Sequence, residues 1–121
     1  MSVHPVIRRR RAERDRMLDT ARSWARGLAV RLPGLVGVVV FGSVARGDFN
    51  KWSDIDVLVV AEDLPSSGRG RLDLLMADSP IGVQPVGWTP AELDLRRRRR
   101  DPIAVEADAV GVVVHGTLPP G

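Results

Sequence analysis

Residues 36–60 read VGVVVFGSVARGDFNKWSDIDVLVV, and this stretch decides the fold. It begins and ends with apolar runs that lack the alternation of a half-exposed strand. We therefore predict two inner strands, 35–41 and 54–61, each covered on both faces. A Gly-Ser turn and a polar loop join them. Phe49 and Trp52 in that loop are predicted to pack over the sheet edge, with stacking on a base as the alternative.

Further helices and strands are predicted on both sides of this pair. Apolar residues at three- and four-residue spacing indicate an amphipathic helix over 8–32. Thr89, Pro90 and Glu92 form a capping-box start for a helix that runs to about residue 99. The other predicted elements are a helical turn at 43–47, a helix at 69–77, an edge strand at 81–88, a helix at 101–109 and a strand at 112–115.

This order of elements predicts a small α/β (α+β) domain with a mixed sheet and helices packed on it. We expect one domain over residues 1–121, because no linker divides the chain. Residues 1–7 and 116–121 are predicted to be loose termini.

The composition restricts the chemistry. The chain has no cysteine and only two histidines, which excludes disulfides and thiolate-bound zinc. Any metal must be held mainly by oxygen, which favours Mg²⁺ or Mn²⁺. No apolar run approaches the roughly 20 residues of a membrane span. We expect a cytoplasmic protein without a membrane partner.

The net charge is +3, and arginines cluster at 8–11 and 96–100. A basic surface attracts phosphates or acidic partners. Solvated helix faces are the other interpretation of these runs. Nucleic-acid binding through them stays open, although the sequence has no set of interleaved aromatics for stacking on bases.

The connection between the two inner strands carries the candidate chemistry. Gly42 follows the first strand and Ser43 opens a helical turn, so backbone N–H groups can approach a phosphate. Arg46 lies one turn on and can add positive charge. Asp54 and Asp56 share one strand face and repel each other unless a cation lies between them. The pattern predicts a metal and nucleotide site.

These residues resemble the signature of the minimal nucleotidyltransferases of the DNA polymerase β superfamily. The likeness rests on GSVARG at 42–47 and SDIDVLV at 53–59 with their flanking strands. It is sharpest over 35–60, and a looser likeness extends to residue 115. The resemblance implies a nucleoside triphosphate donor, expected to be ATP, together with Mg²⁺ or Mn²⁺. A hydroxyl then attacks the α-phosphate and pyrophosphate leaves.

The same resemblance implies roles for individual residues. Gly42 and Ser43 would hold the β- and γ-phosphates, and Arg46 would be a further phosphate contact. Asp54 and Asp56 would bind the metal ions as catalytic residues.

The family has a third carboxylate on the strand after the next helix, and Gln84 stands in the matching place here. Glutamine can ligate through its carbonyl, but it carries no charge and accepts no proton. Loss of a general base costs about 10²–10⁴ in rate. Two hypotheses follow. One is an active nucleotidyltransferase with Asp54, Asp56 and Gln84 as catalytic residues, and the other is a degenerate one that acts as a binding module.

The resemblance also implies a protein partner. Small members of the family work beside an all-helical protein of the HEPN type as a toxin–antitoxin pair, in which the nucleotidyltransferase is the antitoxin and can transfer AMP to its partner. No second domain that could bind an acceptor is predicted here. We therefore expect the acceptor hydroxyl to lie on such a partner.

Overall fold

The computed structural model describes residues 4–121 and has the predicted order of elements. The helices are α1 (Pro5–Arg31), α2 (Gly42–Arg46), α3 (Gly68–Met76), α4 (Pro90–Arg98) and α5 (Pro102–Val110). The strands are β1 (Leu35–Phe41), β2 (Ile55–Ala61), β3 (Val83–Trp88) and β4 (Val112–Gly116). The predicted fold class, a small mixed α/β domain, is confirmed.

The four strands form one mixed sheet in the order β3-β2-β1-β4. β1 pairs antiparallel with both β2 and β4, whereas β2 and β3 are parallel. The central position of β1 and β2 and the edge position of β3 are therefore as predicted. Because β2 and β3 are parallel, the chain crosses over between them through α3.

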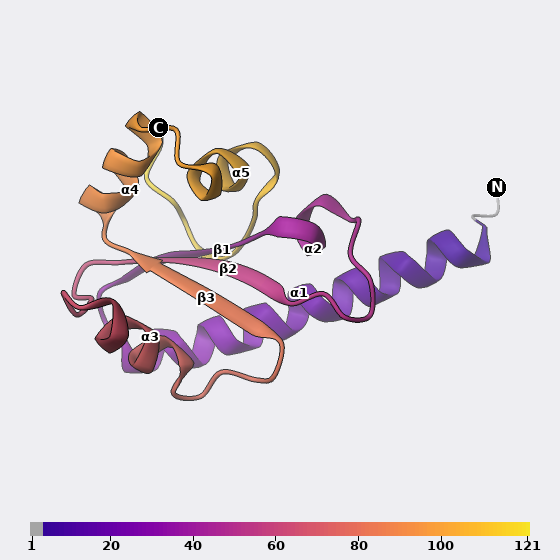
Figure 1. Cartoon of the computed structure of the whole chain (residues 1–121). Coiled ribbons are helices and arrows are strands. Elements are labelled where there is room, and N and C mark those ends of the chain that lie inside the picture. The colour runs from indigo at the N-terminus through magenta and orange to yellow at the C-terminus, as the bar shows by residue number, and fades with distance from the viewer. Residues whose placement is uncertain (1–3) are drawn as a thin grey trace.

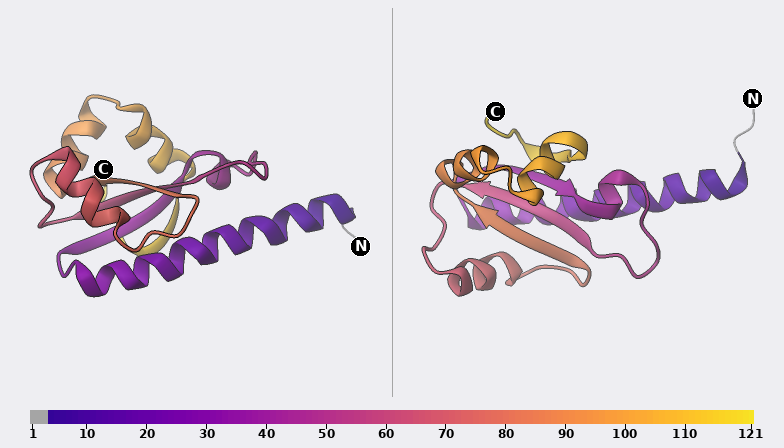
Figure 2. Two further views of the ribbon diagram at one scale, coloured as in Figure 1. Left: turned by 60° about the horizontal axis from the view of Figure 1, so that its bottom comes forward. Right: turned by 45° about the horizontal axis from the view of Figure 1, so that its top comes forward.

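Helices cover both faces of this sheet, so side chains that alternate along one strand enter two separate cores (Figure 1). On β1, Val38 and Val40 pack on the side of α1 and α3. Val39 and Phe41 pack on the side of α4 and α5. Figure 2 shows α1 on one side of the sheet and α4 and α5 on the other. This double coverage explains the unbroken apolar runs of the two central strands.

The first helix begins earlier than its apolar pattern indicated. His4 caps α1 by accepting a hydrogen bond from the Val6 N–H at 3.1 Å, and Pro5 occupies the first turn. The prediction of a loose start is therefore wrong for residues 5–7, while residues 1–3 lie outside the described part of the chain. The first buried residue of α1 is Leu18, and the helix extends past the sheet at its N-terminal end (Figure 1).

The capping box at the start of α4 is present as predicted. The Thr89 side chain accepts from the Glu92 N–H at 3.2 Å, and Glu92 accepts from the Thr89 N–H at 3.0 Å. Glu92 also accepts from Arg71 of α3 at 2.7 Å. The cap thus joins α3 to α4 around the β3 edge. Within residues 4–121, none of the helices has the length and apolar character needed to cross a membrane.

Candidate active site

The turn between β1 and α2 brings the backbone against a carboxylate. Gly42 has a φ of 73°, in a region that side-chain-bearing residues rarely adopt. A Cβ atom on Gly42 would overlap Oδ2 of Asp56 and would lie 3.2 Å from its Cγ. Glycine is therefore required here both by conformation and by close approach. Ser43, half-buried, follows in the first turn of α2.

Two arginines of α1 hold the segment that follows this turn. Arg14 donates to the carbonyl groups of Val44 and Ala45 at 2.9 and 3.0 Å. Arg10 donates to the Phe49 carbonyl at 2.7 Å and lies over its ring at 4.8 Å from the centroid. Carbonyl groups at the end of a short helix lack partners within that helix, and these arginines supply them. Arg10 belongs to the 8–11 run, which is therefore partly structural.

The two aspartates predicted as metal ligands differ in their surroundings. β2 begins at Ile55, so Asp54 lies just before the strand and is exposed, whereas Asp56 lies on it and is half-buried. Burial raises the pKa of Asp56 above its ordinary value, and the negative charges of Asp54 and Glu106 raise it further. Arg46 acts in the opposite direction. Burial and the two neighbouring negative charges thus outweigh the effect of Arg46 on the pKa of Asp56.

Gln84 lies beside this carboxylate. Asp56 of β2 and Gln84 of β3 are partners in the parallel ladder, so their side chains leave the same face of the sheet. Gln84 is exposed, which leaves its carboxamide accessible to a ligand. The register therefore places Gln84 beside Asp56 on the adjacent strand.

Arg46, predicted as a phosphate contact, is engaged within the chain. Its Nε lies 3.2 Å from Oδ2 of Asp48, and its Nη1 forms an ion pair with Oε1 of Glu106. Glu106 was not found from the sequence, although it comes from α5 and acts on both Arg46 and Asp56. Glu106 directly precedes Ala107, which is buried on α5, so its place on that helix was the indication that the sequence offered of a role near the sheet. No pattern in the sequence indicated that α5 crosses the sheet near residue 56.

The donor set suits a hard divalent cation. Asp54 and Asp56 offer carboxylate oxygens and Gln84 a carbonyl oxygen, and such cations prefer oxygen ligands. Across residues 4–121, no group of three or more histidine, aspartate or glutamate side chains is arranged to hold a metal ion. A cation at this site would therefore need further oxygen ligands from outside the chain, such as water or a phosphate.

Residues 24–110 match the sequence pattern of the nucleotidyltransferase domain. The chain belongs to the nucleotidyltransferase domain family. The matched region includes the β1–α2 turn, both aspartates, Gln84 and Glu106. The resemblance read from the sequence is confirmed at the level of the family.

Two Methanocaldococcus jannaschii proteins are similar to this nucleotidyltransferase domain. One, named "Putative protein adenylyltransferase MJ1305", is 32% identical over 69 residues, which are 51% of this chain and 47% of that protein. The other, named "Putative protein adenylyltransferase MJ0141", is 48% identical over 29 residues, which are 24% of this chain and 29% of that protein. The aligned part thus spans about half of the first relative and less than a third of the second.

Two solved structures share the fold of this nucleotidyltransferase domain. A Sulfolobus solfataricus protein described as a "putative nucleotidyltransferase" aligns with a TM-score of 0.65 at 24% identity, over 86% of this chain and 84% of that one. A structure titled "Crystal structure of the toxin-antitoxin with AMP-PNP" aligns with a TM-score of 0.55 at 21% identity, over 79% of this chain and 73% of that one. At these identities the likeness is one of fold.

The aromatic residues beside the site of this nucleotidyltransferase domain have separate environments. Phe49 is 2% exposed and packs in the core, as predicted. Trp52 is 81% exposed, so the prediction that it packs over the sheet edge is wrong. The backbone N–H of Trp52 donates to Oδ1 of Asn50 at 2.8 Å, in a turn that leaves the indole exposed to solvent. An exposed indole close to Asp54 in sequence can stack on a base.

Proposed function

We propose that this chain is a divalent-metal-dependent nucleotidyltransferase that transfers AMP from ATP to a hydroxyl group on a partner protein. The observation that carries the proposal is the close approach of the Gly42 backbone to the Asp56 carboxylate, with Gln84 in register on the next strand. The turn that would bind phosphate and the oxygens that would bind a metal ion are thus close together, which supports the proposal. Family membership and the names of the two archaeal relatives support this assignment.

In the proposed reaction the acceptor oxygen forms a bond to the α-phosphorus of ATP, and the bond from that phosphorus to the bridging oxygen breaks. Pyrophosphate leaves, and the hydroxyl proton passes to solvent. The backbone at Gly42 and the hydroxyl of Ser43 would bind the β- and γ-phosphates and so orient the α-phosphate for in-line attack. Asp54 and Asp56 would hold Mg²⁺ or Mn²⁺, which neutralises charge on the phosphates when bound.

Gln84 and Arg46 have supporting roles in this proposal. The Gln84 carbonyl oxygen would ligate the cation or accept a hydrogen bond from the acceptor hydroxyl, but it would not remove the proton. Arg46 would contact a phosphate by exchanging its ion pair with Glu106 for one with the nucleotide. Turnover is therefore expected to be slow compared with a site that has three carboxylates.

We propose that the acceptor lies on a small helical protein of the HEPN type and that the two form a toxin–antitoxin pair. The neighbour of similar fold whose title names a toxin–antitoxin and AMP-PNP supports this proposal. Since ATP is the expected donor, the cytoplasm is the proposed location.

The direct test uses ATP labelled at the α-phosphate, Mg²⁺ and the protein encoded by the neighbouring gene. Label should pass to that protein, and Asp56→Ala should lower the transfer more than about 100-fold. Asp73→Ala, an exposed aspartate on α3, is the matched control and should leave transfer unchanged. If transfer survives Asp56→Ala, the assignment of the metal site is wrong.

A degenerate nucleotidyltransferase that neutralises its partner by contact alone is the second candidate. The neutral side chain of Gln84 in register with Asp56, and the lack of a three-carboxylate group among the described residues, favour it. It predicts a complex with the partner that is equally tight in Asp54→Ala and Asp56→Ala variants, with no transfer of label. Measurement of both properties on the same samples separates the two candidates.

The second arginine run, 96–100, does not favour a nucleic-acid function. Three of its arginines form ion pairs with acidic residues of the same chain: Arg96 with Asp101, Arg97 with Asp108, and Arg98 with Asp94. Arg97 also donates to the Pro119 carbonyl at 2.6 Å. Binding of RNA or DNA with a steep salt dependence would be the evidence needed for this alternative.

A further inference from the structure

Trp52 differs from every other aromatic residue of the chain. The sequence has three tryptophans, two phenylalanines and no tyrosine. Four of these five residues are at most 7% exposed: Trp24, Trp88, Phe41 and Phe49. Trp52 is 81% exposed. Single exposed apolar residues are common, so exposure alone does not indicate a ligand. The surroundings of the indole do.

The turn at residues 50–53 fixes the backbone that carries the indole. Asn50 accepts from the Trp52 N–H through Oδ1 at 2.8 Å, and its carbonyl accepts from the Ser53 N–H at 3.0 Å. The Ser53 hydroxyl accepts from the Asn50 N–H at 2.9 Å. Just before the turn, Arg10 of α1 holds the Phe49 carbonyl. A ligand of Trp52 would therefore meet a backbone that is already ordered, which lowers the entropy cost of binding.

The surroundings of the indole suit a planar ligand better than a protein surface. Nζ of Lys51 lies 5.0 Å from the centroid of the Trp52 ring, so it covers one face and leaves the other open. The residues nearest to Trp52 in the chain are polar or charged, whereas the centres of protein–protein interfaces are depleted in charged residues. A base needs only the one open face, and the ammonium beside it favours a ligand that carries negative charge.

The indole is attached next to the candidate active site. Trp52 precedes Asp54 by two residues, which separates their Cα atoms by at most about 7 Å. In the proposed function, the phosphates bind at Gly42 and Ser43, and Asp54 and Asp56 hold the cation. The base is the other end of such a ligand, and it would extend away from the phosphates. An exposed aromatic ring beside Asp54 is a suitable surface for it.

We propose that Trp52 stacks on the base of the bound nucleotide and gives the site a preference for purines over pyrimidines. The inference rests on the proposed function for the nucleotide and its phosphate site, and it adds the residue that selects the base. Every base has a π-face, so stacking tolerates different bases. A purine has two fused rings and covers more of the indole than a pyrimidine does. ATP and GTP should therefore both bind more tightly than CTP.

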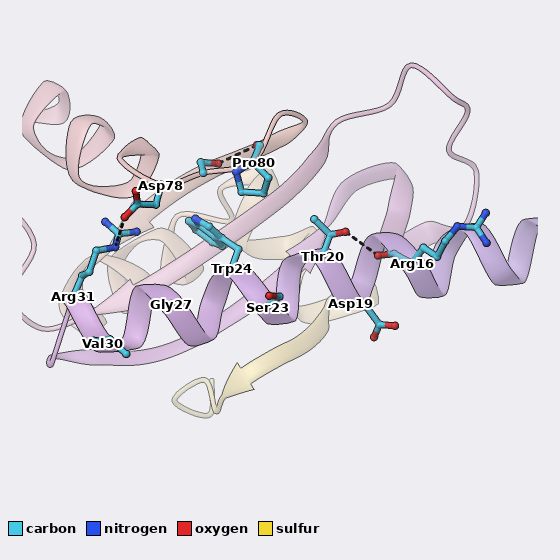
Figure 3. Close-up of a pocket in the computed structure, with 11 residues that line it drawn as sticks. Arg16, Asp19, Thr20, Ser23, Trp24, Gly27, Val30, Arg31, Asp78 and Pro80 are labelled. Carbon is cyan, nitrogen blue, oxygen red and sulfur yellow. Dashed lines mark hydrogen bonds and ion pairs between the residues drawn. The ribbon is translucent and has the colours of Figure 1, made fainter.

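A groove on the α1 side of the sheet is the other place where a nucleotide would contact a tryptophan. It has a volume of about 1060 Å³ and is lined by residues of α1, among them Trp24 and Gly27, and by residues 78–80. Figure 3 shows the Trp24 indole on the side of α1 that faces Asp78 and Pro80. The lining contains two arginines and two aspartates, so it offers no excess of positive charge to phosphates.

Tryptophan fluorescence distinguishes these two places. Because Trp24 and Trp88 are buried, acrylamide should quench mainly the emission of Trp52 in the wild type. MgATP should lower this emission and protect it from acrylamide. Trp52→Phe should show neither effect, since only the two buried indoles remain. An equal response of Trp52→Phe and the wild type would place the nucleotide beside another tryptophan and overturn the inference.

Calorimetric titration measures the contribution of the ring to affinity. Trp52→Leu keeps an apolar side chain without a π-face, so it should bind MgATP about fivefold or more weakly and lose less affinity for MgCTP. Its affinity for magnesium tripolyphosphate, which has no base, should equal that of the wild type. Val30→Ala is the matched control, because Val30 is 82% exposed on α1, and it should bind all three ligands like the wild type. Both variants should keep the wild-type melting temperature.

The outcomes separate this inference from the proposed function. Equal affinity of Trp52→Leu and the wild type for MgATP would overturn the inference and leave the proposed function standing. Equal affinities of the wild type for MgATP and MgCTP would do the same. A wild-type chain that binds neither MgATP nor magnesium tripolyphosphate would refute the proposed nucleotide site and the role of Trp52 with it.

Discussion

Asp56 and Gln84 stand side by side on the parallel strands β2 and β3, at paired positions in the ladder. The first is a carboxylate whose pKa is raised by burial and by neighbouring negative charge. The second is its uncharged neighbour on the same face. In the proposed function, this pair would set how strongly the site binds a cation, because a change of charge at position 84 alters the proposed ligand set at one residue.

Gln84→Glu tests that relationship. A third carboxylate beside Asp56 should strengthen Mn²⁺ binding about 10-fold or more, and without metal it should lower the melting temperature through added repulsion. Calorimetric titration with MnCl₂ and thermal unfolding with and without the metal measure both effects. Gln84→Met, similar in size but without an oxygen, should not bind Mn²⁺ more tightly than the wild type. Equal affinity of Gln84→Glu and the wild type would place residue 84 away from the cation.

Substitution of two glycines with positive φ, Gly42 and Gly47, distinguishes the cost of backbone strain from the cost of a steric clash. Gly47→Ala introduces strain alone, because a Cβ there meets no atom within 4 Å, and should cost about 1–2 kcal/mol of stability. Gly42→Ala adds a clash with Asp56 and should cost more than about 2 kcal/mol. Urea denaturation gives both values. Equal losses of stability in the two variants would mean that a Cβ atom at residue 42 does not clash with the Asp56 carboxylate.

Arg14 is expected to hold α2 in place. Arg14→Ala removes two hydrogen bonds to carbonyl groups and should cost about 1–3 kcal/mol. It should also speed hydrogen exchange at the Gly47 amide, which bonds to Ser43 across α2. Arg26→Ala, on an exposed part of the same helix, should change stability by less than about 0.5 kcal/mol. If both variants behave alike, the contacts of Arg14 are not needed for the turn.

Glu106 is expected to oppose nucleotide binding. Glu106→Gln removes a negative charge near Asp56 and releases Arg46 from its ion pair, so affinity for MgATP should rise about two- to fivefold. Asp108→Asn, on the same helix but paired with Arg97, is the control and should leave this affinity unchanged. Titration of each variant with MgATP measures the effect. A weaker affinity in Glu106→Gln would instead make Glu106 part of the binding site.

The capping box predicts a pH dependence of stability. Burial by itself would raise the pKa of Glu92, but hydrogen bonds from Thr89 and Arg71 lower it overall below the ordinary 4.5. A lowered pKa gives stability that is present above the ordinary value and is lost as the pH falls through the folded-state value. Glu92→Gln should therefore cost about 0.5–1 kcal/mol at pH 7, and this difference should shrink in acid. A constant difference from pH 7 to pH 3 would contradict the assignment.

Local signals in the sequence were sufficient for most of the fold. The apolar runs at 35–41 and 54–61 predicted the two central strands, since strands covered on both faces lose their alternation. The capping box predicted the start of α4 because its hydrogen bonds join residues three apart. The start of α1 was predicted too late, because the arginines after Pro5 show no apolar periodicity while His4 supplies the cap.

The sequence by itself determined the family and the order of the elements. It also determined which residues form the β1–α2 turn and the Asp54–Asp56 pair. Each of these features depends on residues close together in the chain. Only the tertiary structure decided that Gln84 lies in register with Asp56, that Glu106 acts on Arg46, and that Trp24 and Gly27 line a groove. These relationships depend on strand register and helix packing between distant segments. Such packing is set by the whole core, so the chemistry of the site and its surroundings depends on contacts that no local pattern records.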